Sequence, residues 1–280
     1  MKRQSEELPP EVALQWHIFR KSLPLQVALQ ESLRLLGKAD GKRCLEVGAV
    51  NGVQSYQLRR AGGTWQSVAF SDRRAVLVGA ALGEEVHVVE DGKLPFEDKA
   101  FDALVVSDAL ERVRADEAFI EECHRVLRPD GKLIVSMRHL KTYSIVRPLR
   151  SLLGLTPERQ GLARGGYTES DLFFILKNGF DVMNVRSYCR LFMALTHTFV
   201  ESVVMRQDRS PTGNSGAVRR AYALAAPFYR LAYQLDMLLF LGRGFILIAL
   251  AKRRAWRPRT APVLTDGRSL TEAVLTRPSR

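Results

Sequence analysis

Short runs of β-branched residues alternate with amphipathic stretches through most of the chain, and no other feature of the sequence limits the possible folds as much. This order is typical of a parallel sheet whose successive strands are joined by crossover helices. Such a sheet holds its ligands at the edge where the strands end. We therefore expect an α/β fold with strands at Arg43–Val47, Trp65–Phe70, Glu85–Val89, Asp102–Ser107, Lys132–Met137 and Phe180–Tyr188.

The segment GFILIALAKRR, residues 244–254, fits either a seventh strand or the end of a membrane span. The apolar stretch before it is interrupted by Arg230, Asp236 and Arg243, each of which is costly inside a bilayer. The uninterrupted apolar run from Phe245 to Ala251 is too short to cross the hydrocarbon layer. We therefore expect a strand at this place and no transmembrane segment.

The character of the sequence changes several times along its 280 residues. Two helical stretches open the chain, a helical, apolar and basic stretch precedes the last strand, and the final residues have the composition of a disordered tail. We expect N-terminal helices at 1–40, a ligand-binding core at 41–190, a helical insertion at 191–241, the last strand of the core sheet at 242–254 and a disordered tail at 255–280.

The positive charge of the chain is unevenly distributed. The net charge is +12, and from Arg190 onward there are 15 Lys and Arg residues against 5 Asp and Glu residues. A basic block of this kind favours phosphate, anionic lipid or nucleic acid, or it is simply a solvated face. The three cysteines lie far apart without a CxxC pair or a Cys/His cluster, so we expect neither disulfides nor a metal site. No signal peptide opens the chain, and we expect a cytoplasmic protein.

The stretch LEVGAVNG follows the first expected strand and forms a glycine-containing turn. A dinucleotide fold needs a third glycine where Val50 stands, because the backbone there approaches a pyrophosphate. A phosphate-binding loop of the Walker type would need a Lys-Ser/Thr pair after Gly52, which is absent. The turn therefore favours a ligand without phosphates, provided that the φ angle of Val50 is negative.

CLEVGAVNG resembles motif I of the class I S-adenosylmethionine-dependent methyltransferases. The stretches VAFSD, EDGKLPFEDKAFDALVVSDALERV, HRVLRPDGKLIVS and GYTESDLFFILKNGFDVMNV are similar to later segments of that family, in the same order. The resemblance implies a Rossmann-like, doubly wound, seven-stranded and mostly parallel sheet with an antiparallel last strand. The helical N-terminal extension and the helical insertion before the last strand would be additions to it.

The same resemblance implies a binding site for S-adenosylmethionine. Asp72 would accept from the ribose hydroxyls, although it could instead cap the following helix, and Asp91 would lie beside the adenine, although it could form a plain turn. Glu46 would contact the ligand or hold the turn. Two residues depart from the family: Val50 stands in place of the middle glycine, and Arg112 stands where relatives often have histidine. The expected cofactor-binding residues are Glu46, Gly48, Asn51, Gly52, Asp72, Asp91, Gly92 and Ser107.

The expected function is methyl transfer from S-adenosylmethionine to a small-molecule or lipid-linked acceptor by in-line displacement. Alignment of the reactants supplies much of the catalysis in such a reaction, and we assign no catalytic base. The basic, apolar insertion suggests a cover for the acceptor that contacts an anionic membrane surface, or a lid without membrane contact. Two alternatives remain open, a catalytically inactive binding protein and, less favoured, a nucleic-acid methyltransferase.

Overall fold

Seven strands form one sheet in the order β3-β2-β1-β4-β5-β7-β6. We describe this fold from a computed structural model, in which residues 9–49, 51–90, 92–140, 145–208, 215–239 and 242–257 are described. Strand β7 is antiparallel to both of its neighbours and the other pairings are parallel, which confirms the expected fold class. The strands are β1 (Arg43–Val47), β2 (Thr64–Ala69), β3 (His87–Val88), β4 (Phe101–Ser107), β5 (Leu127–Arg138), β6 (Phe180–Tyr188) and β7 (Ile246–Arg253).

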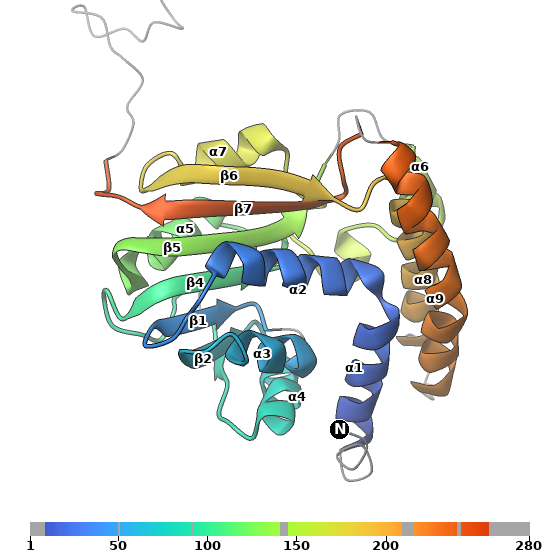
Figure 1. The fold of residues 1–280 in the computed structure, drawn as a ribbon, viewed down its shortest axis with the longest axis horizontal. Coiled ribbons are helices and arrows are strands. Elements are labelled where there is room, and N and C mark those ends of the chain that lie inside the picture. The colour runs from blue at the N-terminus through green and yellow to red at the C-terminus, as the bar shows by residue number, and fades with distance from the viewer. Residues whose placement is uncertain are drawn as a thin grey trace, which may run out of the picture.

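Helices cover both faces of the sheet and stand along the edge where the parallel strands end (Figure 1). In the view of Figure 1, α2 and α3 lie in front of the sheet and α5 lies behind it, while α8 and α9 stand at the right-hand edge. The α-helices are α1 (Pro10–Lys21), α2 (Leu23–Leu36), α3 (Gly52–Arg59), α4 (Asp72–Leu82), α5 (Asp116–Val126), α6 (Val146–Leu152), α7 (Glu169–Leu176), α8 (Leu191–Asp208) and α9 (Ser215–Leu238), and the 3-10 turns are η1 (Leu110–Arg112) and η2 (Glu158–Gln160).

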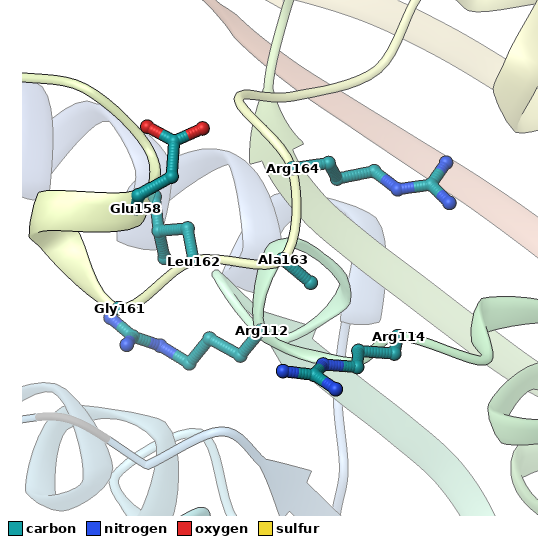
Figure 2. Close-up of a pocket in the computed structure, with 7 residues that line it drawn as sticks. All are labelled: Arg112, Arg114, Glu158, Gly161, Leu162, Ala163 and Arg164. Carbon is teal, nitrogen blue, oxygen red and sulfur yellow. The ribbon is translucent and has the colours of Figure 1, made fainter.

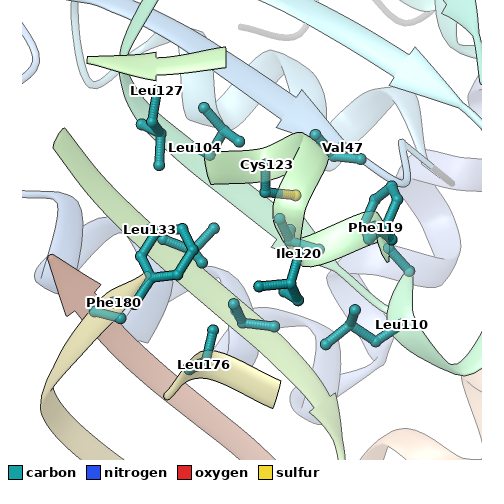
Figure 3. Close-up of a cluster of buried hydrophobic side chains, with 14 of the residues drawn as sticks. Val47, Leu104, Leu110, Phe119, Ile120, Cys123, Leu127, Leu133, Leu176 and Phe180 are labelled. Carbon is teal, nitrogen blue, oxygen red and sulfur yellow. The ribbon is translucent and has the colours of Figure 1, made fainter. Parts of the chain in front are cut away.

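The two faces of the sheet pack into two separate hydrophobic clusters. Successive side chains of a strand point to opposite faces, so Leu104 and Val106 join one cluster while Ala103 and Val105 join the other. The larger cluster includes residues from α5 and α7, shown in Figure 3. Because the central strands are apolar on both faces, they are held rigidly, and their carboxyl ends provide a fixed edge for a site.

Several element bounds differ from those expected. The stretch DEAFIEECHRVLRPDG has a helical pattern, with Pro129 and Gly131 as its expected stop, but α5 ends at Val126, because Leu127 leaves the helix to pair with Phe101 of β4. Pro129 cannot donate a helical hydrogen bond and favours extended backbone at the residue before it, which fits this early end. Strand β2 ends at Ala69, one residue earlier than expected, and β3 is shorter than expected.

Helices α8 and α9 form an antiparallel pair that we call the lid. The buried residues of α9 recur every three or four positions, as one helical face requires: Val218, Tyr222, Ala225, Tyr229, Ala232 and Asp236. Asp236 accepts hydrogen bonds from the backbone amides of Phe192 and Met193 at the start of α8. The first amides of a helix have no hydrogen-bond partner within the helix, and Asp236 satisfies two of them. The hydrogen bonds therefore connect α9 to the start of α8.

The last described residues pack against the core. The Trp256 ring lies 4.9 Å from the His124 ring, and the amide of Arg257 donates to the carbonyl of Asn178. The disordered tail was expected at 255–280; residues 255–257 are described and include these contacts, and residues 258–280 lie outside the described residues.

Candidate functional site

The turn after β1 is tightly enclosed at the edge where the parallel strands end. Gly48 has a φ angle of +86°, and a Cβ atom there would lie 2.5 Å from the carbonyl oxygen of Ser107. The amides of Gly48 and Ala49 both donate to the carbonyl of Val68, over 2.9 and 3.0 Å. Glycine is therefore required at position 48, because a side chain would collide with the end of β4 and be strained in its backbone conformation.

Helix α3 begins directly behind this turn. The side chain of Asn51 caps the helix by accepting from the amide of Val53 over 2.9 Å. The amide of Gly52 donates to Oε1 of Gln15 over 2.8 Å, and a Cβ atom at Gly52 would lie 2.3 Å from that of Ala81. Gly52 thus allows α3 and α4 to approach closely, while α1 covers the start of α3. Val50 lies outside the described residues, so its expected φ angle stays a prediction.

Glu46 is buried beneath the turn rather than exposed at its surface. One of its oxygens accepts from the hydroxyl of Ser67 over 2.8 Å and lies 4.0 Å from Nη1 of Arg59. Burial raises the pKa of Glu46, and hydrogen bonds from Ser55 and Ser67 oppose that shift. Its described contacts therefore connect β1 to α3 and β2.

The other expected residues surround the same edge. Asp72 is exposed and is the first residue of α4, three positions beyond the end of β2. Ser71 occupies the N-cap position. Gly92 is half-buried in a turn with a φ angle of +76°, and Asp91 lies outside the described residues. Ser107 ends β4, and its hydroxyl accepts from the side chain of Gln54 over 3.2 Å.

Asp108 follows β4 in the left-handed region, with a φ angle of +48°. Its amide donates to the carbonyl of Ser136 over 3.0 Å, which holds the chain at the end of β5. The side chain is exposed at this edge and lines a small cavity together with Glu111, Arg112 and Arg138. Burial raises the pKa of Asp108, while Arg138 and Arg112 oppose the shift.

Glu111 is a buried carboxyl group next to Asp108. It is 2% exposed, and its Oε1 accepts from the backbone amide of Arg138 over 2.5 Å. Its Oε2 is buried without a hydrogen-bond partner among the described residues. Burial, together with the nearby charge of Asp108, raises the pKa of Glu111 to about 7.

A half-buried charge network connects the lid to the end of β5. Glu201 of α8 accepts from Arg138 over 2.9 Å and from Arg150 of α6. Burial alone would raise the pKa of Glu201, but Arg138, His197 and Arg150 outweigh it and hold the pKa at about 2. His197 shares a hydrogen bond of 2.9 Å with the hydroxyl of Tyr229. The sequence reasoning missed this network, whose partners are far apart in the chain.

Two adjoining cavities open beside η1 at this edge. The larger has a volume of about 660 Å³, and Figure 2 shows the residues around it. The smaller has a volume of about 50 Å³ and is lined by Asp108, Glu111, Arg112, Arg138 and Leu162. The larger is lined by Arg112, Arg114, Glu158, Gly161, Leu162, Ala163 and Arg164.

The loop that carries residues 158–164 was not assigned from the sequence. It is fixed over η1 by a hydrogen bond of 2.7 Å from the amide of Ala163 to the carbonyl of Glu111. His139, directly after β5, is buried and bonded through Nδ1 to the carbonyl of Gly244. Among the described residues, no group of three or more His, Cys, Asp or Glu side chains is placed to hold a metal ion.

This sheet order, with a reversed seventh strand and a glycine turn after β1, defines the Rossmann-like fold of the class I methyltransferases. Residues 45–135 match the family model described as a methyltransferase domain. Residues 45–135 therefore form a methyltransferase domain, in a chain that has the fold of the S-adenosylmethionine-dependent methyltransferases.

Curated relatives match only part of the chain. A demethylmenaquinone methyltransferase of Tropheryma whipplei (strain Twist) is 30% identical over 105 residues, which cover 36% of this chain and 44% of the relative. The protein of the same name from Mycobacterium sp. (strain KMS) is 34% identical over 108 residues, which cover 38% of this chain and 46% of the relative. The chain thus spans less than half the length of these relatives.

Solved structures resemble the chain over most of its length. An S-adenosylmethionine dependent methyltransferase from Mesorhizobium loti superposes with a TM-score of 0.53 at 18% identity, covering 81% of this chain and 98% of its own. A geranyl diphosphate methyltransferase in complex with S-adenosylmethionine gives a TM-score of 0.51 at 14% identity, covering 81% of this chain and 85% of its own. At these identities the likeness establishes the fold alone.

Proposed function

We propose that this chain binds S-adenosylmethionine across the carboxyl ends of β1, β2 and β4 and transfers its methyl group to a small-molecule acceptor. The observation that carries the proposal is the Gly48 turn, which leaves no room for a side chain where a ligand would approach the backbone. The match of residues 45–135 to a methyltransferase domain supports it independently.

The proposed cofactor contacts follow the order of the sheet. Gly48 and the start of α3 at Asn51 and Gly52 would surround the methionine part, with Glu46 supporting the turn from below. Asp72 would reach the ribose from the first turn of α4, Asp91 and Gly92 would lie beside the adenine, and Ser107 would close the site from β4. Gln15 already accepts from the amide of Gly52, so α1 would act as a cover over this end of the site.

Bound S-adenosylmethionine supplies a methyl group that is already activated on a sulfonium, so the protein need only align the acceptor and exclude water. Alignment of reacting groups can supply on the order of 7–11 kcal/mol. The lid, tied to the end of β5 through Glu201 and Arg138, would hold the acceptor against the β4 edge and exclude solvent. We assign no side chain as a catalytic base.

The finer proposal for the acceptor is an apolar, quinone-like or lipid-linked molecule. It rests on the curated relatives, which are named for methylation of demethylmenaquinone, and on the outer surface of α9. There Leu224, Phe228 and Leu231 are 72%, 61% and 53% exposed. No described helix is both long and apolar enough to cross a bilayer, so the contact we propose is peripheral, between this surface and an anionic membrane.

Calorimetric titration with S-adenosylmethionine and S-adenosylhomocysteine tests the proposal. We expect micromolar binding that Gly48→Ala weakens at least tenfold, because the new methyl group would meet the end of β4. The matched control is Gly83→Ala, which places the same methyl group at a φ angle of +70° with nothing within 4 Å. Absence of binding to either ligand by the unaltered chain would contradict the proposal.

The alternative of a non-catalytic methyltransferase fold has one structural observation in its favour. The amide of Gly52, at a helix start suited to a carboxylate, is already bonded to Gln15. If Gln15 blocks the site, Gln15→Ala should improve cofactor binding. If α1 instead helps to close the site, the same substitution should weaken it.

A further inference from the structure

Arginine side chains gather at the larger cavity without enough partners. Arg112 of η1 and Arg114 both line it, and Figure 2 shows both side chains extending to the same side, beneath the loop of Gly161 and Leu162. Nε of Arg112 is buried with no acceptor among the described residues. Arg74 of α4 lies close enough to interact with both Arg112 and Asp108. We call Arg74, Arg112 and Arg114 the arginine cluster.

The nearby acidic groups do not neutralise this cluster. Asp108 and Glu111 both interact with Arg112, but Asp108 also faces Arg74 and Arg138, so these two carboxyl groups are shared among several guanidinium groups. Glu158 lines the cavity, yet Figure 2 shows its carboxylate directed away from Arg112 and Arg114.

One arginine near the cluster is paired with other residues, and one member of the cluster is perturbed by its neighbour. Nη1 of Arg164, the third arginine of the cavity wall, lies 3.0 Å from Oδ2 of Asp116, and its guanidinium group stacks over the ring of Tyr167. Burial, with the like charge of Arg112, lowers the pKa of Arg74 to about 10. Guanidinium groups held close together in a partly enclosed place are stabilised by an anion between them.

The cavity lies on the acceptor side of the site. Its loop is hydrogen-bonded to η1, which follows β4, and its neighbouring cavity is lined by Arg138 at the end of β5. The Gly48 turn lies on the other side of β4, at the end of β1. An anion in the arginine cluster would therefore belong to the molecule placed beyond the methyl group.

We propose that the arginine cluster binds a carboxylate or phosphate group of the methyl acceptor, which makes this acceptor an amphiphile with an anionic end. That the bound anion belongs to the methyl acceptor rests on the proposed function, whereas the anion site itself rests on the arginine cluster. Arginine suits such a site because its planar, permanently charged fork matches both carboxylate and phosphate geometry.

Calorimetry of the full chain with inorganic pyrophosphate and with malonate, at low and at moderate salt, tests the inference. We expect binding of at least one of these anions, weakened at least tenfold by Arg112→Gln and further by Arg112→Gln with Arg114→Gln, because hydrogen bonds to charged groups are lost. The matched control is Arg60→Gln, which removes one exposed positive charge at the far end of α3. Arg112→Lys should retain part of the binding.

The same variants are titrated with S-adenosylmethionine, whose own carboxylate is the other anion that the cluster could hold. We expect its affinity to stay within about twofold of the unaltered chain. Loss of S-adenosylmethionine binding with unchanged anion binding would overturn the inference, as would failure of both anions to bind or an effect no larger than that of Arg60→Gln. Anion binding by a chain that does not bind S-adenosylmethionine would support the arginine cluster and contradict the proposed function instead.

Discussion

A single buried carboxyl group, Glu111, should make the stability of the protein depend on pH. Its pKa is 4.5 for the free group and about 7 in the fold, because burial and Asp108 disfavour its charge. Below pH 4.5 the group is neutral in both states. Between pH 4.5 and 7 the unfolded chain releases the proton first, so this group lowers the free energy of unfolding as the pH rises.

Glu111→Gln should therefore stabilise the protein at pH 8, by on the order of 1–3 kcal/mol, and have little effect at pH 4.5. Glutamine keeps the oxygen that accepts from Arg138 and removes the charge. Urea unfolding at the two pH values measures the difference, with Glu85→Gln as an exposed control. Equal stabilisation at both pH values would show that charge is not the cause.

Site residues could be predicted from the sequence where a local pattern contains them. Gly48 and Gly52 belong to one short motif, and the close approach of neighbouring atoms explains why both are glycine. Glu201 and Arg138 are separated by 63 positions, and neither lies in a pattern that points to the other. Their pairing depends on how the lid is placed over β5, which only the three-dimensional structure provides. Arg112 was noted as a departure from the family, but its missing partner could not be read from the sequence.

At the scale of elements, Asp236 makes one of the contacts that hold the two helices of the lid together. Asp236 is 3% exposed and accepts from the amides of Phe192 and Met193, at 2.8 and 3.3 Å. We expect Asp236→Ala to lower the free energy of unfolding by about 2 kcal/mol, because two buried amides lose a charged acceptor. The same substitution should also accelerate amide hydrogen exchange at the start of α8, because these amides are then less well held.

Two further variants make this experiment specific. Asp236→Asn keeps one acceptor oxygen and should have a smaller effect. Gln234→Ala, at an exposed position of the same helix, should leave exchange at the start of α8 unchanged. Equal exchange in all three variants would mean that the hydrogen bonds of Asp236 do not hold the start of α8 in place.

Strands were predicted better than the elements between them. Runs such as DALVVS and KLIVSM are apolar on both faces, and burial in a parallel sheet explains that composition. The chain between β5 and α7 has no comparable pattern, and there α6 and η2 went unassigned. Their positions follow from contacts with α8 and η1, so tertiary structure rather than local propensity decides them.

For the whole molecule, the outer surface of α9 makes the membrane proposal testable. Its exposed apolar residues lie among Arg219, Arg220 and Arg230, which would attract anionic lipid. We expect the protein to sediment with vesicles of phosphatidylcholine and phosphatidylglycerol, and less with phosphatidylcholine alone. Phe228→Glu with Leu231→Glu should reduce binding at least tenfold, because apolar contact is lost and negative charge is added.

The control for this experiment is Val76→Glu, which adds the same charge at a 69% exposed apolar residue of α4. It should bind vesicles nearly as the unaltered chain does. If the α9 variant also sediments normally, the lid has no membrane contact and serves only as a cover.

The position of β7 has a consequence for how the molecule is made. Strand β6 pairs with β7 and not with β5, so it has no neighbour in the sheet until residues beyond the lid have been synthesised. A nascent chain that has reached only the end of α9 would therefore carry two open strand edges, on β5 and on β6. Such edges are prone to wrong pairing. The last strand then enters between them and completes the sheet, which closes the long connection that contains α8 and α9.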